Sequence, residues 1–271
     1  MRSAPEADGA APLSSIPAAC ASACPEPCAS CDARRVSLCR VVPDERLHRL
    51  AERLSVRRFA PGETLAFDGD PATFVLNITQ GSVKVFRSMA DGRRSVTGFL
   101  FAGDFLGLVS GETFSFGAEA LEPVVVCRFL KADFRRLLKE MPDLEAELLD
   151  RVSHELEAAQ DQMLLLSRKT ALERVATFIL RLAERSAASG VAADVARFPM
   201  TRADIADYLG LTTETVSRTL TRLKVTGVIR LIEGNAARVL RPDRLAQLAS
   251  ADTPQAQGRQ TPAVQSGGLR A

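Results

Sequence analysis

Five of the six cysteines lie close together near the start of the chain, and the sixth stands alone in a Val-rich run. Cys28 and Cys31 have the C-x2-C spacing, which puts two thiolates within reach of one metal centre. Thiolates are soft ligands that suit iron–sulfur clusters or zinc, and a [4Fe–4S] cluster needs four. In a reducing cytosol such cysteines are more often ligands than disulfides. A lone cysteine such as Cys127 is by itself more often an inert core residue.

The two histidines offer no obvious enzymatic chemistry. His48 and His154 stand in polar, helical contexts without a nucleophile partner, and no phosphate loop or catalytic triad is recognisable. We therefore do not expect an enzyme.

Composition places few limits on the partner. The net charge of +2 is too small to predict a nucleic-acid partner without a local site. No apolar stretch is long enough to span a bilayer, and the Ala- and Pro-rich N-terminus makes a poor signal peptide. We expect a cytoplasmic protein with no membrane partner.

Residues 200–223, MTRADIADYLGLTTETVSRTLTRL, have the pattern of a helix-turn-helix. Thr201 is an N-cap for a helix over about 202–208, and Gly210 supplies the turn. Thr212 or Thr213 caps a second helix that runs to about Thr226. GVIRLIEGNAARVL then predicts a β-hairpin wing.

The second helix presents polar side chains in its first turns, which enter the major groove in such units. Glutamate accepts from cytosine and arginine bonds guanine in bidentate fashion, each pair discriminating by about 1–3 kcal/mol. The residues predicted on this face are Thr213, Glu214, Ser217 and Arg218. The predicted phosphate contacts are Thr201, Arg202, Thr212 and Arg222. The alternative is an ordinary helical hairpin with a solvated face.

The elements that must position these residues follow from hydrophobic periodicity. Short strand-like runs with glycine turns over about 52–130 predict an antiparallel barrel or sandwich. A long helix follows, with an apolar seam at a spacing of three and four residues that favours pairing with a second copy over packing on its own domain. The seam consists of Leu149, Val152, Leu156, Ala159, Met163 and Leu166.

The order of these parts, together with GDFLG at 103–107 and QMLLLSRKTALERVATFI at 162–179, resembles the superfamily of the cyclic-AMP receptor protein and the fumarate–nitrate reduction regulator. The resemblance implies an α+β fold: a cyclic-nucleotide-binding-like β-roll, a long dimerisation helix and a C-terminal winged helix-turn-helix. The expected parts are a disordered tail (1–23), a cysteine-rich segment (24–45), the β-roll (46–138), the dimerisation helix (139–168), the DNA-binding domain (169–250) and a second disordered tail (251–271).

Similarity to the oxygen-sensing branch implies a [4Fe–4S] cluster on Cys28, Cys31, Cys39 and Cys127. Cys24 matches a cysteine that some relatives carry but do not need, although it could replace one of the three upstream ligands. Cys20 has no counterpart. ETVSR at 214–218 implies a homodimer on palindromic double-stranded DNA with TTGAT-like half-sites, read by Glu214, Ser217 and Arg218.

The same resemblance bears on the remaining partners. RNA polymerase is expected to contact surface loops such as SMADGRRS at 88–95. The cyclic-nucleotide branch holds its phosphate with an Arg-Ser pair, and the corresponding stretch here, ETFSFGAEALEP, has no arginine. We therefore expect no cyclic nucleotide. The implied mechanism is oxygen-sensitive dimerisation. A zinc-stapled regulator and a haem- or small-molecule-responsive regulator of the same fold are the alternatives.

Overall fold

A computed structural model describes residues 28, 31–89, 91–108, 111–188, 190, 192–232 and 235–250. The predictions of disordered tails at 1–23 and 251–271 fall outside these residues, as do Cys20 and Cys24.

Two four-stranded antiparallel sheets face each other in the N-terminal half, and apolar side chains from both fill the space between them. One sheet has the order β1-β8-β3-β6 and the other the order β2-β7-β4-β5. The strands are β1 (Leu54–Phe59), β2 (Thr64–Ala66), β3 (Phe74–Gln80), β4 (Ser82–Ser88), β5 (Arg94–Phe101), β6 (Phe105–Leu106), β7 (Gly117–Ala120) and β8 (Val124–Leu130).

The turn expected at Gln80 and Gly81 passes the chain from one sheet to the other. The strands β3 and β4 on either side of it belong to different sheets, whereas β4 and β5 form the hairpin closed near Asp91 and Gly92. The prediction of an antiparallel β-roll is confirmed.

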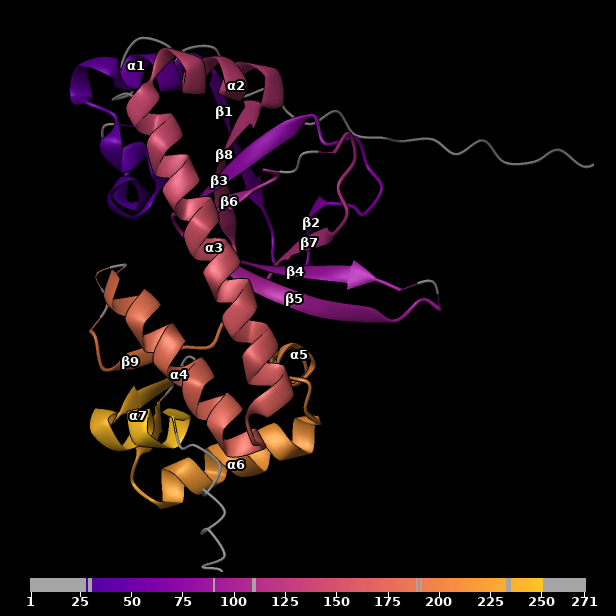
Figure 1. Ribbon diagram of the computed structural model, residues 1–271, viewed down its shortest axis with the longest axis vertical. Coiled ribbons are helices and arrows are strands. Elements are labelled where there is room, and N and C mark those ends of the chain that lie inside the picture. The colour runs from indigo at the N-terminus through magenta and orange to yellow at the C-terminus, as the bar shows by residue number, and fades with distance from the viewer. Residues whose placement is uncertain are drawn as a thin grey trace, which may run out of the picture.

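Short helices and one long helix flank the roll. The segment before it forms the 3-10 helices η2 (Asp32–Val36), η3 (Leu38–Val41) and η4 (Asp44–Arg46) and then α1 (Leu47–Ala51). After β8 come α2 (Lys131–Glu140) and α3 (Pro142–Arg168), which begins with its proline in the first turn. In Figure 1 the N-terminal segment lies beside the upper part of α3, and α3 continues down to the C-terminal half.

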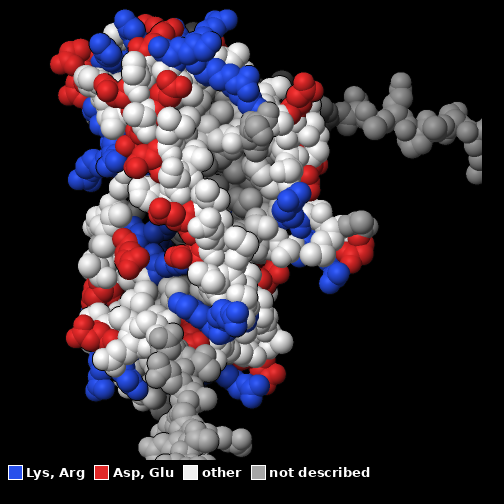
Figure 2. Space-filling view, in the orientation of Figure 1, with Lys and Arg blue, Asp and Glu red and all other residues white. Residues whose placement is uncertain are grey.

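The middle of α3 faces outward. Figure 2 shows an uncharged strip along this helix, bordered by acidic side chains. Among the described residues, Leu149, Val152, Leu156 and Met163 are exposed large apolar side chains on α3.

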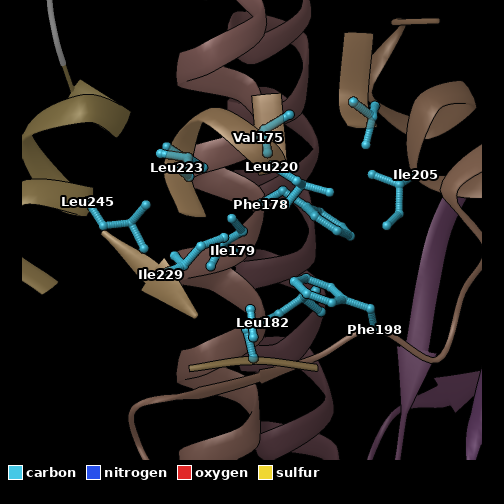
Figure 3. Close-up of a cluster of buried hydrophobic side chains, with 14 of the residues drawn as sticks. Val175, Phe178, Ile179, Leu182, Phe198, Ile205, Leu220, Leu223, Ile229 and Leu245 are labelled. Atoms are coloured by element: carbon cyan, nitrogen blue, oxygen red, sulfur yellow. The ribbon is translucent and has the colours of Figure 1, made fainter. Parts of the chain in front are cut away.

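The C-terminal half has its own core. It contains α4 (Ala171–Ala188), β9 (Val195–Arg197), α5 (Arg202–Leu209), α6 (Thr213–Val225), β10 (Ile229–Ile232), β11 (Ala236–Val239) and α7 (Pro242–Ser250). Figure 3 shows side chains of α4, such as Phe178 and Ile179, meeting Ile205, Leu220 and Leu245. The predicted wing hairpin is present, and β9, which the sequence pattern did not indicate, adds a third strand to it.

The two halves are docked through the β4–β5 hairpin. The Lys84 ammonium lies 2.9 Å from the Asp204 carboxylate on α5, and the Val96 amide donates to Asp207 at 2.7 Å. The Phe99 and Tyr208 rings meet edge to face at 5.2 Å. The first helix of the helix-turn-helix is thereby attached to the β-roll.

Within the described residues, no helix is both long enough and apolar enough to cross a membrane.

Candidate functional site

The structure brings the four predicted metal ligands to one small cavity. Cys28 and Cys31 precede η2, Cys39 lies in η3 and Cys127 lies in β8. All four line a cavity of about 20 Å³, whose wall includes Leu50, Leu54 and Phe129. Strand β8 places Cys127 there because it is a central strand, with Cys127 opposite Val56 on one side and Asn77 on the other.

The cavity makes charged thiolates costly. Burial, followed by the neighbouring Cys28, Cys31 and Cys39, raises the pKa of Cys127 to about 12. Burial also raises the pKa of Cys39, against a lowering hydrogen bond from Ser37. The thiols at these two positions are therefore protonated near neutral pH, and a bound cation is what would hold the four sulfurs as thiolates.

A buried amide lies at the edge of this cavity. Asn77 is 2% exposed, its Nδ2 lies 4.0 Å from the Cys39 sulfur, and its Oδ1 has no hydrogen-bond partner among the described residues. A donor directed at a ligand sulfur is the usual means by which a protein tunes a metal–thiolate site. The sequence pattern did not point to Asn77, because the contact depends on strand register.

Four thiols that line one cavity have the right chemistry for a metal–thiolate group. The distances between them, however, are not those of ligands around a metal. No group of three or more Cys, His, Asp or Glu side chains in the described residues is arranged to hold a metal ion as it stands. A cavity of about 20 Å³ has room for a single small species. A four-iron cluster would therefore need more room between the four cysteines than this cavity offers.

The seam predicted for the dimer lies open on the single chain. Leu149, Leu156 and Met163 are each more than 60% exposed, and Val152 is 52% exposed. Ala159 is also exposed, whereas Leu166, at 40%, borders Gly210. An apolar stripe of this kind is covered when two copies pair along it.

The helix-turn-helix has the local structure expected from its caps. Thr201 forms a capping box with Asp204 at the start of α5, and Gly210 ends that helix in the left-handed conformation. Thr212, rather than Thr213, is the N-cap of α6 and accepts from the Thr215 amide at 3.2 Å. Buried Ile205, Leu209, Val216, Leu220 and Leu223 pack the two helices together.

The predicted base-reading residues share one exposed face of α6. Thr213, Glu214, Ser217 and Arg218 are exposed, and Glu214 and Arg218 lie 3.4 Å apart as an i,i+4 pair with both side chains about three-quarters exposed. Such a pair contributes little to stability, so both side chains remain available to DNA. Arg222 is exposed one turn further along.

The Arg202 side chain, predicted to contact phosphate, is half-buried against an aromatic ring. Its guanidinium lies over the Phe198 ring at 5.3 Å, and one of its nitrogens is buried without a partner in the part of the chain that the structure describes. Burial lowers the pKa of Arg202. A phosphate contact by this residue would require its side chain to swing away from Phe198. The Thr201 hydroxyl is likewise engaged, since it donates to Asp204 at 2.6 Å.

A groove of about 920 Å³ runs between the β-roll and α3. Arg40, Arg151 and Arg185 line it, but each is bonded to a carboxylate of this chain: the first two to Glu147 and the third to Asp104. The stretch 112–123 contributes Phe116 to the wall and no cation. The groove therefore has little free positive charge for an anionic ligand, and Val152, Leu156 and Ala159 connect it to the seam.

Two protein-family models match the chain: a cyclic nucleotide-binding domain over residues 56–141 and a Crp-like helix-turn-helix domain over residues 173–248. The chain is 40% identical to the nitrogen fixation regulation protein FixK of Bradyrhizobium diazoefficiens, over 83% of this chain and 94% of that protein. It is 39% identical to the fumarate and nitrate reduction regulatory protein of Escherichia coli, over 69% of this chain and 76% of that protein.

The fold also matches a solved structure of a similarly named protein. The structure of FixK2 from Bradyrhizobium japonicum superposes with a TM-score of 0.67 at 33% identity, covering 75% of this chain and 99% of that one. The names of these relatives describe regulators, and none describes an enzyme.

Proposed function

Since the chain belongs to the Crp/Fnr family of transcriptional regulators, whose helix-turn-helix members bind DNA as dimers, we propose that an oxygen-labile [4Fe–4S] cluster controls its DNA binding. The observation that carries this proposal is the convergence on one cavity of three cysteines from the N-terminal segment and Cys127 from the β-roll. If Cys127 were only an inert core residue, nothing would require it to share a cavity with three other cysteines.

The residues of this chain divide the work between them. Cys28, Cys31, Cys39 and Cys127 would hold the cluster, which when bound supplies an oxygen-sensitive iron–sulfur centre. While the site is loaded, the N-terminal segment is tied to the β-roll beside the start of α3. Release of the thiolates frees that segment, and the population shifts from paired to unpaired α3 helices.

The paired state places two recognition helices on one face of the DNA. We expect a palindromic site with TTGAT-like half-sites, read in each half by Glu214, Ser217 and Arg218. RNA polymerase would contact exposed loops such as the β4–β5 turn. We expect no cyclic nucleotide, because the groove cations are already bonded to carboxylates.

Two alternatives have an observation in their favour. Zinc would use the same four thiolates and is closer in size to the 20 Å³ cavity, which would make the site a fold staple without redox chemistry. The large groove would suit a small-molecule-responsive regulator.

The test is an absorption spectrum of protein purified without air, recorded before and after exposure to air, with iron, sulfide and zinc measured on the same sample. We expect broad visible absorption that decays in air, and equal amounts of iron and sulfide. Cys39→Ser and Cys127→Ser should abolish it, whereas Cys20→Ser should not. Stoichiometric zinc without sulfide would establish the structural zinc site instead. A colourless, metal-free protein that cannot be reconstituted with iron and sulfide would refute both metal proposals.

A further inference from the structure

A buried carboxylate on α3 binds the segment that carries Cys39. Glu147 is 7% exposed and accepts two hydrogen bonds from the Arg40 guanidinium, at 2.9 Å to Oε1 and 2.8 Å to Oε2. Arg40 directly follows Cys39 in η3, 107 residues away from Glu147 in the sequence. Because a bidentate pair fixes orientation as well as distance, the position of η3 relative to α3 is set at this point.

Arg151, one turn later on α3, joins the same carboxylate to η2. Its Nε donates to Glu147 at 3.1 Å, and its Nη2 donates to the carbonyl of Val36 at 2.6 Å. Val36 ends η2, between Cys31 and Cys39. We call Arg40, Glu147 and Arg151 the α3 clamp. It binds the cysteine-bearing segment to α3 on both sides of Leu38.

The clamp lies between the thiol cavity and the dimer seam. Leu38, which is fully buried, packs in the same hydrophobic cluster as Leu144 of α3 and three cysteines of the cavity, Cys28, Cys39 and Cys127. In the other direction, Leu149 and Val152 are the first exposed seam residues and are interleaved with the clamp residues on α3.

From this arrangement we propose that the α3 clamp transmits the state of the cysteine site to the dimer seam, an inference that rests on the proposed function. A movement of Cys39 on ligand binding or loss carries Arg40 with it. Displacement of Arg40 leaves Glu147 buried with one cationic partner fewer, which is an unfavourable state. The first turns of α3 then relax, and the seam changes its position. Arg40 and Glu147 are positioning residues that touch neither metal nor DNA.

The test compares Arg40→Ala and Arg40→Lys with a matched control, Arg53→Ala. The Arg53 guanidinium pairs with Glu140 on α2 at 3.0 Å, so this control removes an arginine–glutamate pair close to the segment but not on α3. The full-length proteins are reconstituted anaerobically with iron and sulfide, their iron and sulfide content is measured, and the dimer dissociation constant is obtained by sedimentation equilibrium before and after loading.

We expect wild type and Arg53→Ala to dimerise at least tenfold more tightly on loading. Arg40→Ala should take up the same iron and sulfide but lose most of that gain, and Arg40→Lys, which keeps the charge without the fork, should be intermediate. A full gain in Arg40→Ala would overturn the inference. Uptake without tighter dimerisation in wild type would overturn it too.

A second measurement keeps the clamp testable if no protein takes up iron. In the metal-free protein, loss of the clamp should free the segment, so iodoacetamide should label Cys39 severalfold faster in Glu147→Gln than in wild type or Arg53→Ala. If no protein takes up iron but Cys39 is labelled faster in Glu147→Gln, the cluster is rejected and the mechanical link between the cysteine-bearing segment and α3 is retained. Equal labelling in all three proteins would reject the clamp whatever the metal result.

Discussion

Replacing Gly103 with alanine tests whether the cysteine-bearing segment is packed on the β-roll as tightly as the structure has it. Gly103 has a φ of +98°, and a Cβ atom there would lie 2.6 Å from the carbonyl oxygen of Val36. The backbone conformation alone costs a non-glycine residue about 1–3 kcal/mol. Crowding of Val36 adds about 1–3 kcal/mol. We therefore expect the free energy of unfolding to fall by roughly 2–6 kcal/mol.

Gly92→Ala is the matched control. Gly92 has a φ of +82°, and a Cβ atom there would have nothing within 4 Å. This variant should therefore lose only the backbone part, about 1–3 kcal/mol. Urea denaturation of the two variants beside wild type gives both values. Val36, which Gly103 contacts, lies between two of the cysteines in the sequence. We therefore also expect Gly103→Ala, but not Gly92→Ala, to retain less metal than wild type. Equal losses of stability in the two variants would refute the packing of the segment on this turn.

Four further predictions concern the seam, the reading face, the domain contact and the thiol cavity. Leu156→Ala should raise the dimer dissociation constant about tenfold or more, since a buried leucine contributes about 1.5–3 kcal/mol, and sedimentation measures this. Arg218→Ala should weaken binding to the palindromic site by about 1–3 kcal/mol per half-site, measured by fluorescence anisotropy. Lys84→Met should lower the free energy of unfolding by about 1–2 kcal/mol near neutral pH, measured by urea denaturation. Burial acts to raise the pKa of Asp204, but hydrogen bonds from Thr201 and Lys84, with the Lys84 charge, together lower it, so this difference should shrink as the pH falls through that lowered pKa. The pKa of Cys127 is raised from 9.0 to about 12, so the thermal stability of the metal-free protein should fall as the pH rises through that range, and less steeply in Cys127→Ala.

Each of these predictions has a contrary outcome. An unchanged dimer in Leu156→Ala would place the interface on another face, and equal loss of affinity for unrelated DNA would make Arg218 a phosphate contact. A difference in Lys84→Met that persists at low pH would remove Asp204 from the contact. Identical alkaline profiles for wild type and Cys127→Ala would mean that this thiol titrates as an exposed one does.

The sequence was sufficient where structure is encoded within a few residues. Thr201, Gly210 and Thr212 cap and separate the helices through hydrogen bonds to residues three positions away, so the helix-turn-helix could be placed almost to the residue. The apolar repeat from Leu149 to Met163 depends only on helical periodicity, and its exposure in the single chain follows from the same pattern. The residue type of the cysteines predicts soft-metal chemistry, and this stays a prediction.

Only the tertiary structure shows contacts between residues that lie far apart in the sequence. The register of β8 determines that Cys127 meets the N-terminal cysteines and that Asn77 lies beside them. The bond between Arg40 and Glu147 joins residues 107 positions apart, and no local spacing predicts it. Arg202, expected on DNA, lies with its guanidinium over the Phe198 ring, a contact with a residue that does not follow from local spacing. Caps and helix periods are set by neighbours along the chain, whereas strand order, buried ion pairs and the convergence of the four cysteines arise only when separate segments share one core.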